Sequence, residues 1–259
     1  MSGRRVAGAV LFGAVAAFAA LGPEVVAADP ARQSLADYLT PPGGAWLLGT
    51  DHLGRSLLAR LAHAARLSLF LAAVCVFSAA LPGTLLGILA AWAGGLVDRA
   101  LSALADAVLA LPGLLLVLLI ASFAPGRFWP LQVGFALTLA VEFFRVVRGT
   151  SQRILAGPAV EASRLLGFGP LYIVRRHLWP DLAPLIGTLA ALSAAACVLG
   201  MAALGFVGIG LRPPEADWGL MMTELFPYHA EAPWAIAQPI ALLFLTVLGL
   251  LLLAGRERA

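Results

Sequence analysis

The sequence of 259 residues contains no lysine, so all 17 of its basic side chains are arginines. A P-loop places a lysine on the nucleotide phosphates, and Schiff-base catalysis and kinase-type phosphoryl transfer also use a lysine. The absence excludes these three kinds of site. The chain therefore does not bind ATP by the usual P-loop route.

Charged residues are also scarce, at 12% of the chain against 61% hydrophobic residues. About a quarter of the residues in a typical soluble domain are charged, so a soluble core of this composition would leave much apolar surface uncovered. A helix needs roughly 20 apolar residues to cross a hydrocarbon layer of about 30 Å, and several segments reach that length. The composition predicts a polytopic membrane protein.

Metal ligands and catalytic motifs are few. The two cysteines, Cys75 and Cys197, lie inside apolar runs and predict neither a disulfide framework nor a zinc site. His229 lies near Glu224 and Glu231, but without the tight spacing of a metal site. Neither a Gly-x-Ser-x-Gly elbow nor a His-Glu-x-x-His motif is present. We expect no metal ion and no catalytic residues in this chain.

Six apolar segments predict an all-α membrane protein with six transmembrane helices. An amphipathic helix over Leu57–Leu69 leads into the second span, and Pro112 breaks the third. Residues 1–66 then hold the first helix and an extracytoplasmic loop, 67–254 a five-helix core, and 255–259 a tail. The predicted spans are Val6–Gly22, Leu67–Ala93, Val97–Phe123, Phe128–Phe144, Leu185–Gly210 and Trp234–Ala254.

The first apolar segment has two interpretations. It follows Arg4 and Arg5 and reads as a first transmembrane helix, or as a signal peptide with Val26-Ala27-Ala28 as its cleavage motif. Six spans place both chain ends on one side of the membrane. With the N-terminus inside, eleven arginines fall inside and six outside, so the positive-inside rule predicts that both ends are cytoplasmic.

Residues 145–184 form a basic, amphipathic segment between two predicted spans. Pro158 suits the first turn of a helix, Glu161 suits the positive end of its dipole, and Gly167 suits a position just past its end. Pro170 begins a second short helix, which Pro180 is expected to stop. The pattern predicts two short helices joined by a bend on the cytoplasmic surface. The alternative is an ordinary interfacial loop whose arginines face anionic lipid.

Five motifs occur in order along the chain and share a pattern with a known family. Glu161-Ala162-Ser163 followed by Gly167 resembles the E-A-A-x-x-x-G loop of bacterial ABC-importer permeases. The others are Gly49-Thr50-Asp51 with Gly54-Arg55 (G-T-D-x-x-G-R), Arg66-Leu67-Ser68-Leu69 (R-x-S-L), Asp106 with Ala110-Leu111-Pro112 (D-x-x-x-A-F-P), and Leu204–Gly210 followed by Pro213-Pro214 and Trp218-Gly219.

Together these motifs resemble the second permease subunit of dipeptide, oligopeptide and nickel ABC importers. The resemblance implies a type I ABC-importer permease fold with cytoplasmic coupling helices, in the inner membrane of a bacterium. It also implies a sister permease, one or two ATPase subunits that bind ATP and Mg, and an extracytoplasmic substrate-binding protein. No nucleic-acid partner is expected. The substrate is left open among dipeptides, longer peptides, nickel and metal chelates.

The resemblance assigns two groups of residues. Glu161, Ala162, Ser163, Arg164 and Gly167 would couple the permease to the ATPases. Ser163, Leu111 and Trp179 depart from the Ala, Phe and Leu of the family pattern. The structural group is Gly49, Thr50, Asp51, Gly54, Arg55, Asp106, Pro112, Gly205, Gly208, Pro213, Pro214, Trp218 and Gly219.

Several side chains have alternative interpretations. We expect Asp51 and Arg55 to form an exposed pair on one helical face that determines the fold. Asp106 is either bonded to a neighbouring helix or part of a proton relay, and Glu142 with Arg145 reads as an interfacial pair. The glycines at 205, 208 and 210 permit close packing or an unwound helix end. The rival functions are a membrane-embedded enzyme that uses Asp106 and a proton-coupled secondary transporter.

Overall fold

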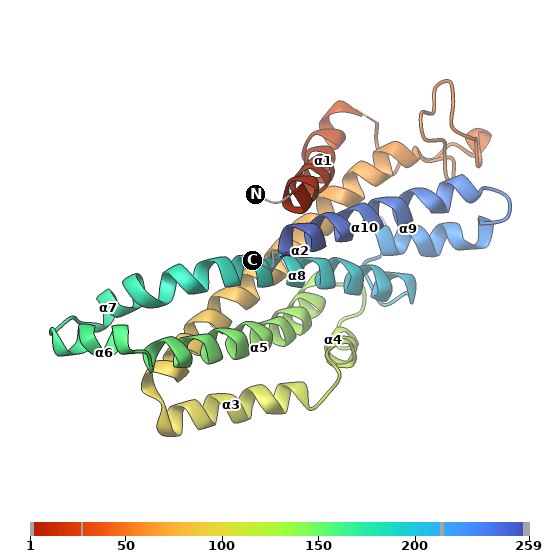
Figure 1. The fold of residues 1–259 in the computed structure, drawn as a ribbon. Helices are drawn as coiled ribbons and strands as arrows, with labels where there is room; N and C mark the ends of the chain where they lie inside the picture. Colours follow the sequence, from red (N-terminus) through yellow and green to blue (C-terminus); the bar gives the residue numbers. More distant parts are fainter. Residues whose placement is uncertain (1–2, 27, 213–214, 256–259) are drawn as a thin grey trace.

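The computed structural model describes residues 3–26, 28–212 and 215–255 as a bundle of long helices with short helices at its ends (Figure 1). Within these ranges the extended backbone is limited to two isolated bridges, Gly43 with Trp46 and Thr50 with Ser56. The elements are α1 (Gly3–Val25), η1 (Leu35–Asp37), α2 (Leu57–Ala93), α3 (Gly95–Leu109), α4 (Gly113–Ala121), α5 (Phe128–Leu155), α6 (Pro158–Leu165), α7 (Pro170–Ile173), η2 (Val174–Leu178), α8 (Trp179–Phe206), α9 (Trp218–Leu225), η3 (Phe226–Tyr228) and α10 (Pro233–Ala254).

The six predicted spans agree with this architecture. Five helices are long and apolar enough to cross a membrane, and the bent pair α3–α4 makes a sixth span if it is counted as one. The two helices of that pair meet at 76°, and α4 begins directly after Pro112. Proline cannot donate the backbone hydrogen bond that a continuous helix needs there, which accounts for the predicted break.

Two helices extend beyond the predicted spans. The amphipathic segment and the second span form one helix, α2, which Ser56 caps by accepting a hydrogen bond from the Ala59 backbone N–H. Helix α5 continues past Phe144 to Leu155. The predicted amphipathic helix from Leu57, joined to the second span, matches α2. The predicted fourth span stops short of the end of α5, because hydropathy locates the end of an apolar stretch whereas a helix ends where its backbone hydrogen bonds end.

Helix α2 forms the centre of the bundle and packs against α5 and α8 (Figure 1). Small residues allow this contact: a Cβ on Gly83 would lie 2.5 Å from the Ala140 carbonyl oxygen, and one on Gly87 would lie 2.9 Å from that of Phe144. The core around this contact includes Cys75 and Cys197, both buried as free thiols.

Helix α1 packs closely along α10. A Cβ on Gly8 would lie 2.7 Å from the Leu253 backbone nitrogen, and one on Gly249 would lie 2.9 Å from that of Phe12. Gly22 meets Ala62 of α2 in the same way. This packing favours a transmembrane helix over a signal peptide. Ala27, in the middle of the candidate cleavage motif, lies outside the described residues.

We expect Gly8→Leu to push α1 away from α10 and to lower the stability of the protein by about 1–3 kcal/mol, as overpacking does. Gly13→Leu is the matched control on the same helix, because no atom lies within 4 Å of a Cβ at that position. Thermal unfolding in detergent would compare the two variants. Equal midpoints would contradict the packing role of Gly8.

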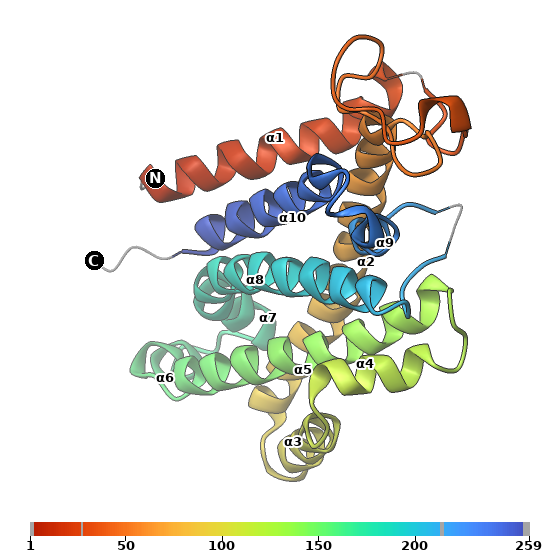
Figure 2. The same ribbon diagram turned by 90° about the vertical axis from the view of Figure 1, so that its right-hand side faces the viewer.

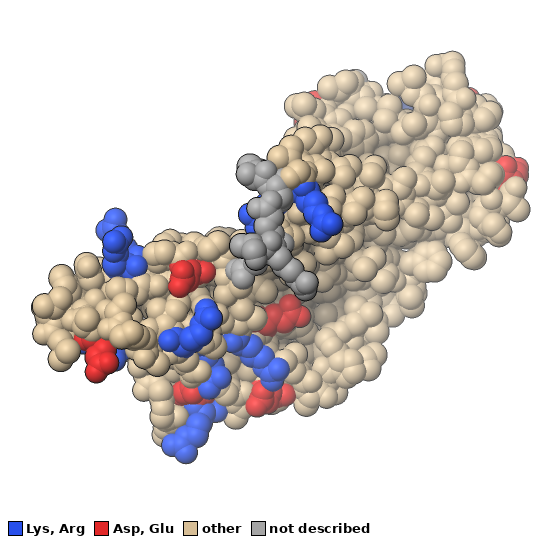
Figure 3. Space-filling model, viewed as in Figure 1, with Lys and Arg blue, Asp and Glu red and all other residues tan. Residues whose placement is uncertain are grey.

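The two ends of the bundle differ in character. The start of α1 and the end of α10 lie at the same end as the hairpin of α6 and α7, and the long loop between α1 and α2 lies at the other end (Figure 2). Charged side chains gather over α3, α5 and α6, whereas most of the remaining visible surface is uncharged (Figure 3). Because both chain ends lie at the same end of the bundle, the arrangement matches an even number of spans. Which end faces the cytoplasm stays a prediction from the arginine count.

Candidate functional site

The segment from Pro158 to Leu178 forms a helical hairpin that projects from one end of the bundle (Figure 1). Pro158 starts α6. Gly167 ends it with φ = 82°, a conformation that glycine adopts without a Cβ clash. The Gly167 N–H donates to the Arg164 carbonyl and the Phe168 N–H to the Ser163 carbonyl, each at 3.0 Å, which makes a Schellman end. The predicted helix and bend are present.

The prediction that Pro180 stops the second helix was wrong. Helix α7 passes through a π-turn, η2, directly into α8, so residues 170–206 form one helical segment. In an α-helix the Pro180 ring would clash with the carbonyl four residues earlier and leave it without a donor. The π-turn removes this conflict, with the Trp179 N–H donating to the Val174 carbonyl. Trp179 itself is half exposed, so its bulk does not disturb this helix junction.

The inner face of the hairpin is buried and held in place. Val160, Ser163 and Ile173 are buried, and the Ser163 hydroxyl lies 2.9 Å from His177 Nε2. The guanidinium of Arg164 lies 5.6 Å from the ring centre of Trp92, at the end of α2. This distance is typical of a cation–π contact. The hairpin is therefore a defined structural element.

The outer face of the hairpin is apolar and exposed. The side chains of Leu165 and Leu171 are 84% and 80% exposed, and Leu166 lies beside them. The rings of Phe168 and Tyr172 stack 4.1 Å apart and are also exposed. We call these five residues the hairpin tip. Soluble surfaces seldom carry so contiguous an apolar patch without a binding role.

The predicted coupling residues divide between the two faces. Glu161, Ala162, Arg164 and Gly167 are exposed, whereas Ser163 faces inward and is not available to a partner. The tip residues are missing from the predicted set, although Leu165 and Leu166 before Gly167 and Phe168 after it are the apolar signal that would have identified them.

At the opposite end of the bundle, Asp51 and Arg55 belong to a buried network of four charged side chains. Asp51 Oδ2 accepts hydrogen bonds from Arg55 Nε and Arg60 Nη1, both at 2.6 Å. Glu224 Oε2 of α9 accepts from Nη2 of the same arginines, at 2.9 and 2.6 Å. We call these residues the outer network. The predicted exposed pair on a helix was wrong, because Asp51 is fully buried in a loop.

The arginines of the outer network favour the charged form of Asp51. Burial acts to raise the pKa of Asp51, but Arg60 and Arg55, together with the backbone N–H groups of Leu53 and Arg55, hold it below its usual value. Sequence reasoning missed Arg60 and Glu224, which are 164 residues apart, and considered Glu224 only as a weak metal ligand. The described residues contain no group of three metal ligands.

The loop that carries Asp51 depends on its neighbours in the predicted motif. Gly49 and Gly54 have φ values of 79° and 69°, and a Cβ on Gly54 would collide with the Ser34 backbone. The buried Thr50 hydroxyl donates to the Asp37 carbonyl and accepts from the Thr40 N–H. These three motif residues therefore fold the loop rather than bind a ligand.

Both interpretations of the glycines around the end of α8 hold. Gly208, at φ = 84°, ends α8 in a second Schellman arrangement, in which the Ile209 N–H donates to the Leu204 carbonyl at 2.9 Å. Gly205 and Gly219 bring α8 and α9 into backbone contact. Trp218 is buried at the start of α9. Pro213 and Pro214 lie outside the described residues.

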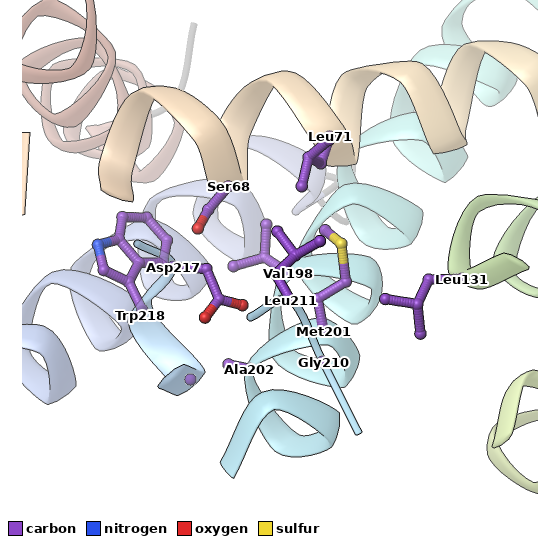
Figure 4. Close-up of a pocket in the computed structure, with 11 residues that line it drawn as sticks. Ser68, Leu71, Leu131, Val198, Met201, Ala202, Gly210, Leu211, Asp217 and Trp218 are labelled. Carbon is purple, nitrogen blue, oxygen red and sulfur yellow. The ribbon is translucent and has the colours of Figure 1, made fainter. Parts of the chain in front are cut away.

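Asp217 is a buried carboxylate that the sequence analysis missed. It caps α9 by accepting a hydrogen bond from the Leu220 N–H at 2.7 Å. It faces Ser68 across a cavity of about 10 Å³, the size of one water molecule (Figure 4). Burial, helped by the nearby charge of Glu224, raises the pKa of Asp217 to about 6.

We expect Asp217→Asn to stabilise the protein at pH 8 and not at pH 4. Ionising Asp217 has no folding cost below its ordinary pKa of 3.8, and the full cost applies above about pH 6, so stability falls as the pH rises through that window. Asparagine keeps the helix cap without the charge, and the gain should approach 2–3 kcal/mol. Unfolding at the two pH values would test this, and an equal gain at both would contradict it.

The carboxylates of α3 bond to arginines of α5. Asp106 pairs with Arg145 at 2.5 Å, and Asp98 pairs with Arg148, whose Nη2 lies 2.6 Å from Asp98 Oδ2. Arg145 therefore pairs with Asp106 and not with Glu142, which corrects the predicted interfacial pair. Asp106 bonds to a neighbouring helix, which agrees with the first of the two interpretations given above.

Solved structures place this architecture in a known class. Two inward-facing structures of the MetNI methionine ABC transporter match with TM-scores of 0.57 and 0.52. The matched regions make up 73% and 69% of this chain and 89% and 87% of the MetNI chains, at 22% and 21% sequence identity. The fold is that of a type I ABC-importer permease.

Sequence comparisons give the family. The family described as binding-protein-dependent transport system inner membrane component matches residues 83–256. The di/tripeptide transport system permease DppC of Pseudomonas aeruginosa is 38% identical over 97% of this chain and 85% of its own. The dipeptide transport system permease DppC of Haemophilus influenzae is 31% identical over 87% of this chain and 78% of its own. The chain belongs to this family of bacterial inner-membrane permeases, which are membrane transport subunits.

Proposed function

We propose that this chain is one of two permease subunits of an ATP-driven importer of short peptides, and that its hairpin tip is the surface on which a cytoplasmic ATPase docks. The observation that carries the proposal is the exposed apolar tip on a hairpin whose inner face is buried. Lipid would not cover the tip, because the charged and exposed Glu161 lies one helical turn before Leu165 of the tip.

The proposed partners follow from the family. A sister permease would form a heterodimer with this chain, and an extracytoplasmic binding protein would deliver the substrate. One or two kinds of ATPase subunit would bind ATP and Mg, a task that a chain without lysine does not perform by a P-loop. The names of the relatives favour dipeptides and tripeptides over nickel or metal chelates as the cargo.

In the proposed mechanism, movement passes from the ATPases through the hairpin tip to α8. ATP binding closes the ATPases, which carry the hairpin tip with them. Because α7 continues through η2 into α8, displacement of the tip moves α8 directly. The bundle then rocks against the sister permease between inward-open and outward-open states. This chain supplies the path and the lever, and the covalent chemistry takes place in the ATPases.

The test is co-purification followed by reconstitution. The chain would be co-expressed with candidate sister-permease and ATPase subunits from the same organism, and assayed with a candidate binding protein in proteoliposomes. We expect ATP-dependent uptake of a labelled dipeptide, and none when the ATPases are omitted. ATP-independent uptake driven by a proton gradient would contradict the proposal, and preferential uptake of nickel would contradict the peptide assignment.

A further inference from the structure

One hydrogen bond joins the two arms of the hairpin. Ser163, buried on the inner face of α6, lies 2.9 Å from His177 in η2. The Ser163 hydroxyl also lies 3.0 Å from the Ala159 carbonyl, and when it donates its single proton there, its oxygen accepts from His177 Nε2–H. Both the neutral Nε2–H tautomer and the imidazolium can donate this bond. The contact therefore does not depend on the charge of His177.

The π-turn and a neighbouring ring fix the position of His177. The extra residue in η2 changes the direction in which the His177 side chain leaves the helix relative to α8. The ring of Tyr172 meets the imidazole edge-on, with ring centres 6.2 Å apart, and Tyr172 in turn stacks on Phe168. His177 thus lies between the hairpin tip and Ser163.

Each arm of the hairpin also contacts the long helices of the bundle. Arg164 of α6 contacts Trp92 at the end of α2. On the other arm, Leu178 and Leu182 are fully buried and pack with Val147 of α5. A force on the tip moves α6 and the start of α8 together only if a contact between the two arms keeps the hairpin from opening.

We propose that the Ser163–His177 bond is that contact, and that the pair are positioning residues that transmit the movement of the ATPase to α8. The proposal rests on the function proposed above. The family pattern resembled by this segment has alanine at position 163, so the bond is a feature of this chain that adds to a hairpin able to fold without it.

The test measures ATP hydrolysed per peptide imported in proteoliposomes that contain the full assembly. Ser163→Ala removes only the hydroxyl, and His177→Phe keeps a ring against Tyr172 without the nitrogen. We expect each variant to raise the ratio about fivefold, the size that one lost neutral hydrogen bond implies. Ser163→Thr keeps the hydroxyl and should restore the wild-type ratio. Thr188→Ala is the control, because that hydroxyl bonds only to a carbonyl of its own helix.

The double variant decides whether the two residues act together. If they form one contact, the double variant behaves like either single variant, because the bond is lost only once. Unchanged ratios in the single variants, or effects that multiply in the double variant, would overturn the proposal. An assembly in which even the wild-type chain shows no ATP-dependent uptake would instead overturn the proposed function.

Discussion

Replacing Arg60 by methionine is expected to lower the free energy of unfolding by about 3–5 kcal/mol, the usual result of removing one partner from a buried ion pair. Arg60 is buried and donates to both Asp51 and Glu224, at 2.6 Å each. Without it, two carboxylates share the single guanidinium of Arg55. Of the bonds of the outer network, the one between Arg55 and Glu224 would then be left to join the loop after α1 to α9.

Arg66→Met is the matched control on the same helix. Arg66 pairs only with Glu24, at 3.2 Å, and both side chains are exposed, so its loss should cost about 0–1 kcal/mol. Unfolding of the two variants in a detergent titration would give the difference. Equal losses would show that the outer network does not hold this end of the bundle.

Gly167→Arg is expected to reduce peptide uptake at least tenfold while the protein still inserts into the membrane and folds. No atom lies within 4 Å of a Cβ at this position, so the side chain meets no steric block. The positive φ disfavours any residue with a Cβ, by about 1–2 kcal/mol. The arginine would stand among the tip leucines, where the proposed ATPase contact lies.

Gly149→Arg provides the control for charge and size. Gly149 is an exposed helical residue of α5, again with open space around it, and it is not part of the hairpin. Expression, unfolding and ATPase activity would be measured beside uptake. Normal coupled uptake by the Gly167 variant would remove the hairpin from the coupling path.

Much of this fold could be predicted because membrane helices are long and apolar. Hydropathy gave all six spans, and Pro112 gave the bend in the third. Gly167 was predictable because its turn chemistry is local: a glycine just past a short helix supplies the left-handed residue that a Schellman end requires.

The features that could not be predicted depend on contacts between residues distant in the chain, or on a backbone adjustment that spans several residues. Nothing near Asp51 in the sequence identifies Glu224 as a partner, so an apparently exposed pair proved to be half of a buried network. Pro180 carries a strong helix-stop signal, but the π-turn before it lets the helix continue. The inward position of Ser163 was in principle readable, since Val160 and Ser163 lie one turn apart on the buried face.

Accessibility of the hairpin tip tests the central claim most directly. Cysteines at Leu165 and Leu171, compared with one at the exposed Leu35 at the opposite end, would be labelled with a membrane-impermeant thiol reagent. The native Cys75 and Cys197 are buried and add little background. The account predicts that the tip cysteines react only from the cytoplasmic side and are shielded once the ATPase subunits bind, while Leu35→Cys reacts only from outside. Tip cysteines that react from outside, or that stay equally reactive in the assembled complex, would contradict it.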